Sequence, residues 1–594
     1  MLGNVPLLAD IMENVNDKGE LDLGYILPLS PGEDPFLEYW VSGGWDGVQE
    51  YHVAKQAVPD EARRELSKVL QIASKGQYYR AEKTLSRVGA EFGAKDTVGA
   101  LMTLAVSGNE LYDEGKIYDF AADVLRRSDS RECVKYAIGL LALYHGYLED
   151  EELWKDLQTA ALSDEFTWYV LMGIKIRRDA KTPDPAGVEA KSSTEDIHAN
   201  ADGRAEEESK APDAAALVKD FTCDGETFDS LNDRIYRIAQ RVHGWGRIHA
   251  VEMLEPTTEE IREWFMTEGF YNTVMEEYTA LTCYRKANVQ ERIHENLTTE
   301  EFQNLGELIA VLLEKGGPGG PTAGIDEIQD SSDLLLTWLD QAEHRDSYPE
   351  DYLNVDHIKD YCMDHMRRPG MEEVYLQSYR ILSSPKAKEA VIQALSDGDN
   401  CYVRLARWMK LPYQKYLLES MRKDLLKNYH NIFYLKEAEW TGEILAIYRE
   451  QIPPQTIDEH SEEISLWENT IVDNRPLSKL LEHLIVSPGG GIDYVKAALA
   501  SNADHARGNA AFTLWKWVCK TKMPLKELSG ELYQAVEEAL RIEDDDDVAE
   551  RMRLLLSGEV GDDDPGEYKF DVCDDLVEES VYGSRKYQRP KTQD

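Results

Sequence analysis

The most unusual string in this sequence lies near its middle and reads RVHGWGRIHAVEML. It places His243, Trp245, Arg247 and His249 between two helical stretches. One interpretation is an inter-helix turn that presents an imidazole, an indole and a guanidinium group to a ligand. The other is structural: two glycines form the turn, Trp245 packs inside, and Arg247 pairs with an acidic neighbour. We favour the structural interpretation.

Carboxylate and imidazole pairs at helical spacing raise the question of a di-iron centre. Helical bundles build such centres with Glu from two helices and Glu-x-x-His from two others, because this spacing aims both groups inward together. Within the helical blocks only Glu291 and His294 match. The second copy, Glu195 and His198, falls in an expected disordered linker. The constellation is incomplete, so we expect no metal there.

A second candidate for metal binding is the segment DHIKDYCMDHM. Helical spacing places Asp360 and Asp364 on one face, and a metal could bind if another helix completed its ligands. The simpler interpretation, which we favour, is an acidic helix face with incidental histidines. The polar side chains concerned are Asp356, His357, Asp360, Cys362, Asp364 and His365.

The glycine clusters do not form a nucleotide-binding motif. Those at Gly43–Gly44, Gly316–Gly320 and Gly489–Gly491 do not spell G-x-G-x-x-G, and none joins a strand to a helix. No Walker A sequence, thiolate haem signature or cysteine nucleophile with partners stands out. These patterns disfavour a conventional dinucleotide-binding enzyme, and they leave catalytic and cofactor-binding residues unassigned.

The elements that must position these side chains are amphipathic helices. The segment 60–73 begins with Asp60, a candidate N-cap, and carries one apolar face. Segments 117–124 and 134–141 carry one stripe each, and the polar turn between them offers Asp129 and Ser130 as caps, which is typical of a helical hairpin. The stripes consist of Leu66, Val69, Leu70 and Ala73; Ile117, Phe120, Ala121 and Val124; and Val134, Ala137, Ile138 and Leu141.

Two helix starts suggest a repeat. Thr257-x-x-Glu260 and Thr298-x-x-Glu301 are both capping boxes that enter apolar runs, and they begin 41 residues apart. HEAT-type repeats have a period of about 40–47 residues. No sustained alternation typical of strands occurs. We therefore predict an all-α fold, a HEAT- or armadillo-like α-solenoid of stacked helical hairpins.

Composition divides the chain into helical blocks, linkers and a tail. The first linker is poor in large apolar residues and is expected to be disordered, and the second is rich in Gly and Pro. The tail is acidic, and solvation is its simplest role. The predicted blocks are 1–177, 213–314 and 332–542, the linkers 178–212 and 315–331, and the tail 543–594.

The charge is strongly negative. Lys and Arg number 65 against 112 Asp and Glu, for a formal charge of −47, which repels phosphate backbones and anionic membranes. We expect no nucleic-acid partner. No basic leader precedes the first apolar stretch, and no apolar run approaches the roughly 18 residues that span a bilayer. The seven cysteines are far apart and odd in number. We expect a soluble cytoplasmic protein with reduced cysteines.

A resemblance adds a specific activity. The string around His243, together with GFYNTVMEEYTALTCYRKA, resembles bacterial proteins named limonene hydroxylase, most closely from Ile235 to Ala287. The resemblance implies NAD(P)H-dependent oxygenation of limonene to carveol and perillyl alcohol, with dehydrogenase activity on those alcohols. It carries no catalytic motif onto particular residues. Such chemistry needs a cofactor, usually haem, flavin or non-haem iron.

The competing hypothesis is a non-catalytic solenoid whose concave surface binds a protein or a peptide. It explains the missing motifs directly, and the residues alone favour it. The first hypothesis implies a small apolar monoterpene as ligand, whereas the second implies a macromolecular partner.

Overall fold

Helices account for the regular structure of the part of the chain that the computed structural model describes. Apart from one isolated antiparallel bridge between Val15 and Leu21, every regular element in these residues is helical. The predicted all-α class is confirmed, and the HEAT or armadillo type stays a prediction. None of the described helices combines the length and apolar character that a bilayer crossing requires. The described residues are 5–22, 25–29, 42–53, 57–108, 111–144, 146–180, 227–295, 297–314, 324–346, 348–457, 475–502, 504–543 and 545–560.

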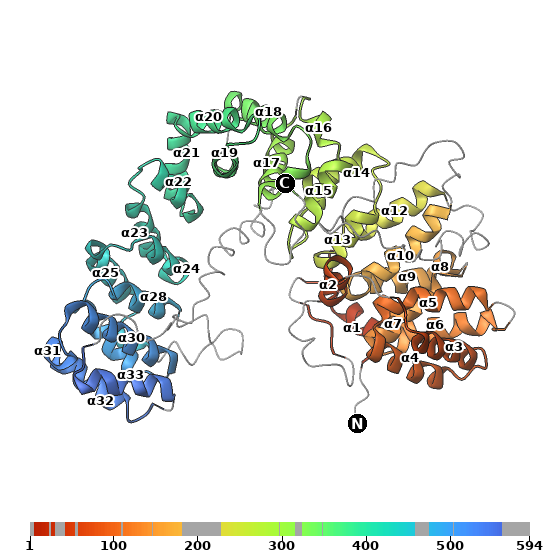
Figure 1. Ribbon diagram of the computed structural model, residues 1–594, viewed down its shortest axis with the longest axis horizontal. Coiled ribbons are helices and arrows are strands. Elements are labelled where there is room, and N and C mark those ends of the chain that lie inside the picture. Colours follow the sequence, from red (N-terminus) through yellow and green to blue (C-terminus); the bar gives the residue numbers. More distant parts are fainter. Residues whose placement is uncertain are drawn as a thin grey trace. The chain divides into compact units, whose positions relative to one another are not determined.

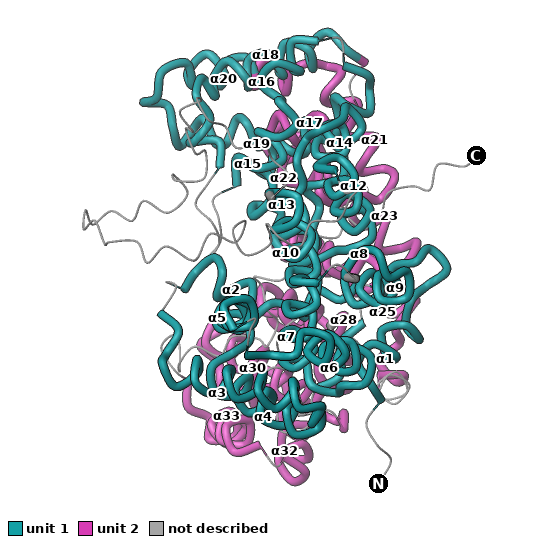
Figure 2. The backbone as a smooth tube through the Cα atoms, turned by 90° about the vertical axis from the view of Figure 1, so that its right-hand side faces the viewer, with its two compact units in different colours: residues 1–345, 357–377 teal, residues 346–356, 378–594 magenta. Residues whose placement is uncertain are grey.

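The chain forms two compact units, which Figure 2 shows in different colours. Unit 1 comprises Met1–Arg345 and His357–Gln377, and unit 2 comprises Asp346–Asp356 and Ser378–Asp594. Two helices, α19 (Pro349–His365) and α20 (Met371–Leu382), contribute residues to both units. Of the segment 315–331, expected to be a linker, the described residues 324–331 belong to unit 1, and residues 315–323 lie outside the described part.

In unit 1, consecutive helices pack on one another along the chain (Figure 1). α3 packs on α4 and α5, α7 packs on α5, α6 and α10, and α10 packs on α12 and α13. α15 then joins α13 to α17. The elements are α1 (Leu7–Glu13), α2 (Gly44–His52), α3 (Asp60–Ala73), α4 (Tyr78–Phe92), α5 (Ala94–Ser107), α6 (Glu114–Arg127), α7 (Arg131–Leu141), α8 (Gly146–Glu149), α9 (Glu151–Ala160), α10 (Asp164–Ala180), α12 (Phe228–Ala239), α13 (Gly244–Met253), α14 (Glu259–Trp264), the π-helical turn η2 (Phe265–Gly269), α15 (Glu277–Lys286), α16 (Val289–Arg292), α17 (Thr299–Leu313), the 3-10 turn η3 (Ile325–Glu327) and α18 (Ser331–His344).

In unit 2, too, helices close in the chain pack on one another. α28 packs on α30, α30 packs on α29 and α33, and α29 and α33 both contact α32. A ladder of buried hydrogen bonds joins α28 to α30, in which Thr513 donates to the Leu481 carbonyl at 3.0 Å and the Trp517 indole donates to the Leu484 carbonyl at 2.6 Å. The elements are α21 (Pro385–Ser396), η4 (Asn400–Tyr402), α22 (Val403–Trp408), α23 (Gln414–Lys423), α24 (Leu425–Asn428), η5 (Tyr429–Tyr434), η6 (Ala438–Trp440), α25 (Thr441–Gln451), η7 (Pro454–Thr456), α28 (Arg475–Leu484), α29 (Ile492–Ala500), α30 (Asp504–Thr521), α31 (Leu525–Leu528), α32 (Gly530–Ala539) and α33 (Asp546–Ser557).

The predicted apolar stripes are buried. All twelve stripe residues of α3, α6 and α7 have at most 2% of their surface exposed, which confirms the predicted faces. Ser130 caps α7 by accepting from the Cys133 N–H at 3.3 Å, as predicted, whereas Asp60 is the first residue of α3, whose N-cap is Pro59. The capping interpretation of Asp60 was therefore wrong.

The two predicted capping boxes have different outcomes. Thr298 and Glu301 form both reciprocal bonds at the start of α17. The cap of α14 is Thr258 and not Thr257, because the Thr258 hydroxyl accepts from the Ile261 N–H while Thr257 accepts from the Asn232 side chain. Adjacent threonines make such a start ambiguous by one residue.

Two predicted segment edges differ from the helices observed. α10 continues through Ala180, past the expected linker start at residue 178, and Arg178 is buried because its guanidinium bonds the Met253 carbonyl and Asn232. Within the expected tail, α33 forms because Asp545 caps it and Met552 and Leu555 are buried. Residues 181–226 and 561–594 lie outside the described part.

Candidate functional site

The glycines of the HGWGR string make room for a buried carboxyl group. Asp164, the first residue of α10, accepts a hydrogen bond from the Trp245 backbone N–H at 3.0 Å, at the start of α13. A Cβ atom on Gly244 would lie 1.9 Å from Asp164 Oδ2, and one on Gly246 would lie 2.8 Å from Oδ1. Gly244 also has a φ of +52°, which side chains disfavour. Both glycines therefore serve the docking of α13 on α10.

Asp164 is a buried hydrogen-bond acceptor at the start of α13, and its pKa is raised. Burial raises the pKa of this carboxyl to about 8, and the nearby Glu165 adds to the shift, although the backbone N–H groups of Gly246 and Trp245 and the Arg247 cation oppose it. The carboxyl is thus mainly neutral at physiological pH. A neutral carboxyl still accepts hydrogen bonds through its carbonyl oxygen.

Arg247 ties three stretches of backbone together. Its guanidinium donates to the carbonyls of Val242 at 2.8 Å, Glu268 at 2.9 Å and Tyr271 at 3.3 Å, and it lies over the Trp264 ring at 5.4 Å. Burial lowers its pKa. The expected pairing with an acidic side chain was wrong: backbone carbonyls take its donors. Arg247 therefore fixes the chain around η2 against α13.

Trp245 fills a notch in α2. A Cβ on Gly47 would lie 2.2 Å from Trp245 Cε3, so only glycine allows this approach. The indole also packs against Tyr51 and Tyr278, with ring centroids 5.9 Å and 5.1 Å away. The expected packing role of Trp245 is thus what the structure shows.

His249 lies deepest in this cluster. It is buried, its ring stacks on Tyr51 at 6.1 Å, and its Nδ1 atom has no hydrogen-bond partner among the described residues. Burial, helped by the Lys95 cation, lowers its pKa to about 3, so the imidazole is neutral at physiological pH. His243 precedes α13, and burial lowers its pKa as well. The indole of Trp245 and the guanidinium of Arg247, which the ligand interpretation requires, are thus engaged in contacts within unit 1.

A buried cluster of charged side chains lies near the start of α13. It was not predicted from the sequence. Lys135 of α7 contacts Asp46 at 2.9 Å, Glu132 at 2.8 Å and Glu165 at 2.6 Å. Burial disfavours its charge, but the three carboxylates raise its pKa well above the usual value. Arg131 lies 3.8 Å from Glu165 and helps lower the pKa of that carboxylate against the effect of burial.

The α2 helix is attached largely through polar groups. Asp46 accepts from the Tyr169 hydroxyl at 2.9 Å, and the Gly43 N–H donates to Glu165 at 2.9 Å. One helical turn onward, Glu50 pairs with Lys95 at 3.1 Å, and the Lys95 ammonium lies 3.2 Å from the Trp168 ring centroid. These contacts join α2 to α5, α7 and α10, so the charges serve the fold of unit 1.

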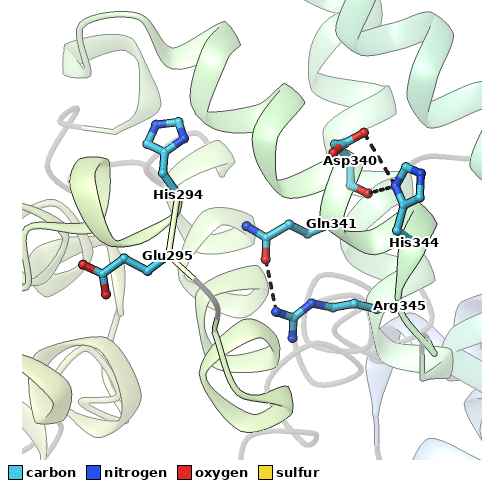
Figure 3. A pocket seen from close by; sticks show the side chains of 6 residues that line it. All are labelled: His294, Glu295, Asp340, Gln341, His344 and Arg345. Carbon is cyan, nitrogen blue, oxygen red and sulfur yellow. Dashed lines mark hydrogen bonds and ion pairs between the residues drawn. The ribbon is translucent and has the colours of Figure 1, made fainter.

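Of the Glu291-x-x-His294 pair, only His294 borders a hollow of about 380 Å³ (Figure 3). His294 and Glu295 line one side, and Asp340, Gln341, His344 and Arg345 line the other. Glu291 instead accepts from Asn288, and Arg345 bonds Gln341 at 3.3 Å and the Leu297 carbonyl at 2.6 Å. Glu291 and His294 are therefore not aimed at one point. Glu195 and His198 lie outside the described residues.

The side chains of the DHIKDYCMDHM segment face different partners. Asp356 pairs with Arg404 at 2.8 Å, Asp360 pairs with Lys359 at 3.2 Å, and His365 stacks on Tyr361 with centroids 4.1 Å apart. Cys362 is buried 3.8 Å from the Met371 sulfur, and burial raises its pKa to about 12. Across the described ranges, no group of three or more His, Cys, Asp or Glu side chains is placed to hold a metal ion.

Fold and site together define an all-α protein of consecutively packed helices, in which the side chains of Trp245, Arg247 and Lys135 join helices to one another. No family model, curated protein or solved structure matches the chain.

Proposed function

We propose that the chain is a non-catalytic helical scaffold that binds a protein or peptide partner. The observation that carries this proposal is the use of Arg247, whose guanidinium bonds three backbone carbonyls of its own unit. The contacts of Trp245 and Asp164 likewise join α13 to α2 and α10. Because the side chains of this string support the fold, we propose the outer helix faces as the functional surface.

The charge of those faces indicates the chemistry of the partner. With 112 acidic against 65 basic residues, the chain carries a formal charge of −47. Such a field speeds association with basic partners and opposes binding to anionic ones. Stacked helices offer extended surfaces for proteins and peptides. We therefore propose a basic protein segment as the ligand.

The oxygenase activity implied by the resemblance stays a prediction. Residues 235–287, which carry the resemblance, cover the C-terminal part of α12 from Ile235 to Ala239 and all of α13, α14, η2 and α15. In this region Arg247 and Trp245 have the structural contacts described above. No described geometry favours a terpene over a macromolecular partner.

One experiment compares the two functions. The purified chain is supplied with limonene, NAD(P)H, and added flavin or iron with an electron donor, and carveol and perillyl alcohol are quantified. In parallel, cellular partners are captured, identified, purified and titrated back onto the chain. Saturable binding of a purified partner without turnover supports the scaffold. Limonene turnover in proportion to the amount of chain would overturn its non-catalytic character.

A further inference from the structure

A helix–turn–helix corner of unit 1 exposes apolar side chains, and hydrogen bonds and buried contacts hold its backbone in place. The corner consists of the end of α19, the turn 366–370 and the first half of α20 up to Leu376. Arg368 in the turn bonds the Asp326 carboxylate and donates to the Tyr361 hydroxyl at 2.7 Å. Beneath it, the Cys362 and Met371 sulfurs lie 3.8 Å apart. These contacts fix the two helix ends, so the corner is preorganised.

Three large apolar residues project from this corner. Met363 is 56% exposed, Met366 41% and Leu376 59%. In the described part of the chain, fifteen large apolar residues are at least 39% exposed, and these three lie within fourteen consecutive positions. Single exposed apolar residues need no explanation, but several close together in one helix–turn–helix segment are typical of an interaction surface.

Charged residues lie in the same segments as the exposed apolar residues. Asp364, Glu372 and Glu373 are exposed on the two helices. Of the two arginines in the turn, Arg368 is engaged with Asp326, which leaves Arg367 as the other basic group of the turn. The corner is therefore acidic as well as apolar.

We infer that this corner docks a short amphipathic helix of the partner, with apolar anchors on one face and Lys or Arg beside them. This inference rests on the proposed scaffold function and names its ligand class. Helices bind apolar surfaces through anchors at helical spacing, and flexible Met side chains adapt to such anchors. The three carboxylates complement the basic groups.

The charge also distinguishes this occupant from two others. A second copy would bring another −47 charge to an acidic surface. An anionic membrane would be repelled for the same reason. A basic helix gains from both the apolar group and the carboxylates.

The test uses the full chain and a labelled synthetic peptide of about 18 residues, five helical turns, with Leu on one face and Lys on the other. A scrambled peptide of identical composition has no apolar face. Binding is followed by fluorescence anisotropy. The amphipathic peptide should bind at least about tenfold more tightly than the scrambled one. Equal affinities would overturn the inference, because charge alone would explain the binding.

The variants locate the site. M363S/M366S/L376S should weaken binding of the amphipathic peptide about tenfold or more, and E372Q/E373Q should reduce the dependence of that binding on salt. The matched control L111S/L426S removes two exposed apolar residues elsewhere and should leave the affinity unchanged. Circular dichroism and melting temperature verify that each variant is folded. Equal weakening by the control, or none by the triple variant, would refute the corner as the site.

Further readouts separate this inference from the proposed function. If a purified natural partner binds wild type and the triple variant equally, the scaffold stands and the corner is wrong. If no partner is found while limonene is oxidised, the proposed function fails whatever the peptide does. Dimerisation, or binding to vesicles of anionic lipid, that the triple variant abolishes would replace the peptide by that occupant and overturn the inference.

Discussion

Replacing Asp164 by Asn tests whether a buried neutral carboxyl caps α13. Burial raises the pKa of Asp164 to about 8 in the folded chain, whereas an unfolded Asp has a pKa of about 3.9. The folded state therefore binds the proton more tightly than the unfolded state. The stabilisation by this group is complete below pH about 4 and is lost as pH rises to about 8.

The size of the expected pH effect follows from the single proton that the folded state holds on Asp164 and the unfolded state releases. Each pH unit between these limits lowers the free energy of unfolding of wild type by up to about 1.4 kcal/mol. Asn is neutral at every pH, and its amide oxygen can still accept from the Trp245 N–H. The free energy of unfolding of Asp164→Asn relative to wild type should therefore rise between pH about 5 and about 8, and then level off.

The assay is urea unfolding of both proteins at several pH values. Asp164→Ala should show the same pH trend as Asp164→Asn. Its free energy of unfolding should be about 1 kcal/mol lower than that of Asp164→Asn at every pH, because Ala cannot accept the Trp245 hydrogen bond. Asp113→Asn, at the exposed N-cap of α6, is the matched control and should not reproduce the trend. If the difference between Asn and wild type does not vary with pH, Asp164 is not a neutral buried cap and the reasoning is refuted.

Three further substitutions test the packing of unit 1. Lys135→Met removes the cation among Asp46, Glu132 and Glu165, so the free energy of unfolding should fall by about 3–5 kcal/mol. The double variant Lys135→Met/Glu165→Gln should recover part of this loss. An unchanged urea midpoint in Lys135→Met would contradict the buried cluster. Gly47→Ala places a Cβ 2.2 Å from Trp245 and should cost about 1–3 kcal/mol, whereas Gly99→Ala, with open space around it, should be neutral or stabilising. Thr298→Ala removes the capping box of α17 and should cost about 1 kcal/mol. Thr258→Ala removes the cap of α14, whereas Thr257→Ala leaves that cap in place; an equal loss of α14 helicity in these two variants would contradict the assigned cap.

Local patterns were enough to predict the helices α3, α6, α7 and α17. The stripes of α3, α6 and α7 are encoded in i, i+3 and i+4 spacing, and Thr298 and Glu301 lie within one turn. Errors arose where two neighbours could cap equally well, as with Thr257 and Thr258. The helix α33 within the expected acidic tail was missed because its aspartates outweighed its short apolar face.

The site required information that the sequence does not carry locally. Asp164 and Gly244 are far apart in the chain, so neither predicts that a carboxyl group fills the space the glycine leaves. Lys135 follows Val134 and precedes Tyr136 in a mostly apolar helix, and periodicity alone cannot identify its three acidic partners on other turns and elements. A charged residue among apolar ones was the available signal for burial.

Titration of a purified natural partner onto the full chain, with limonene turnover measured in the same preparation, tests the proposed scaffold most directly. We predict saturable binding with a Kd in the micromolar range or below, weakening between about 50 and about 300 mM salt, and no NAD(P)H-dependent carveol or perillyl alcohol. NAD(P)H-dependent oxygenation of limonene, with no partner that binds saturably, would contradict the account.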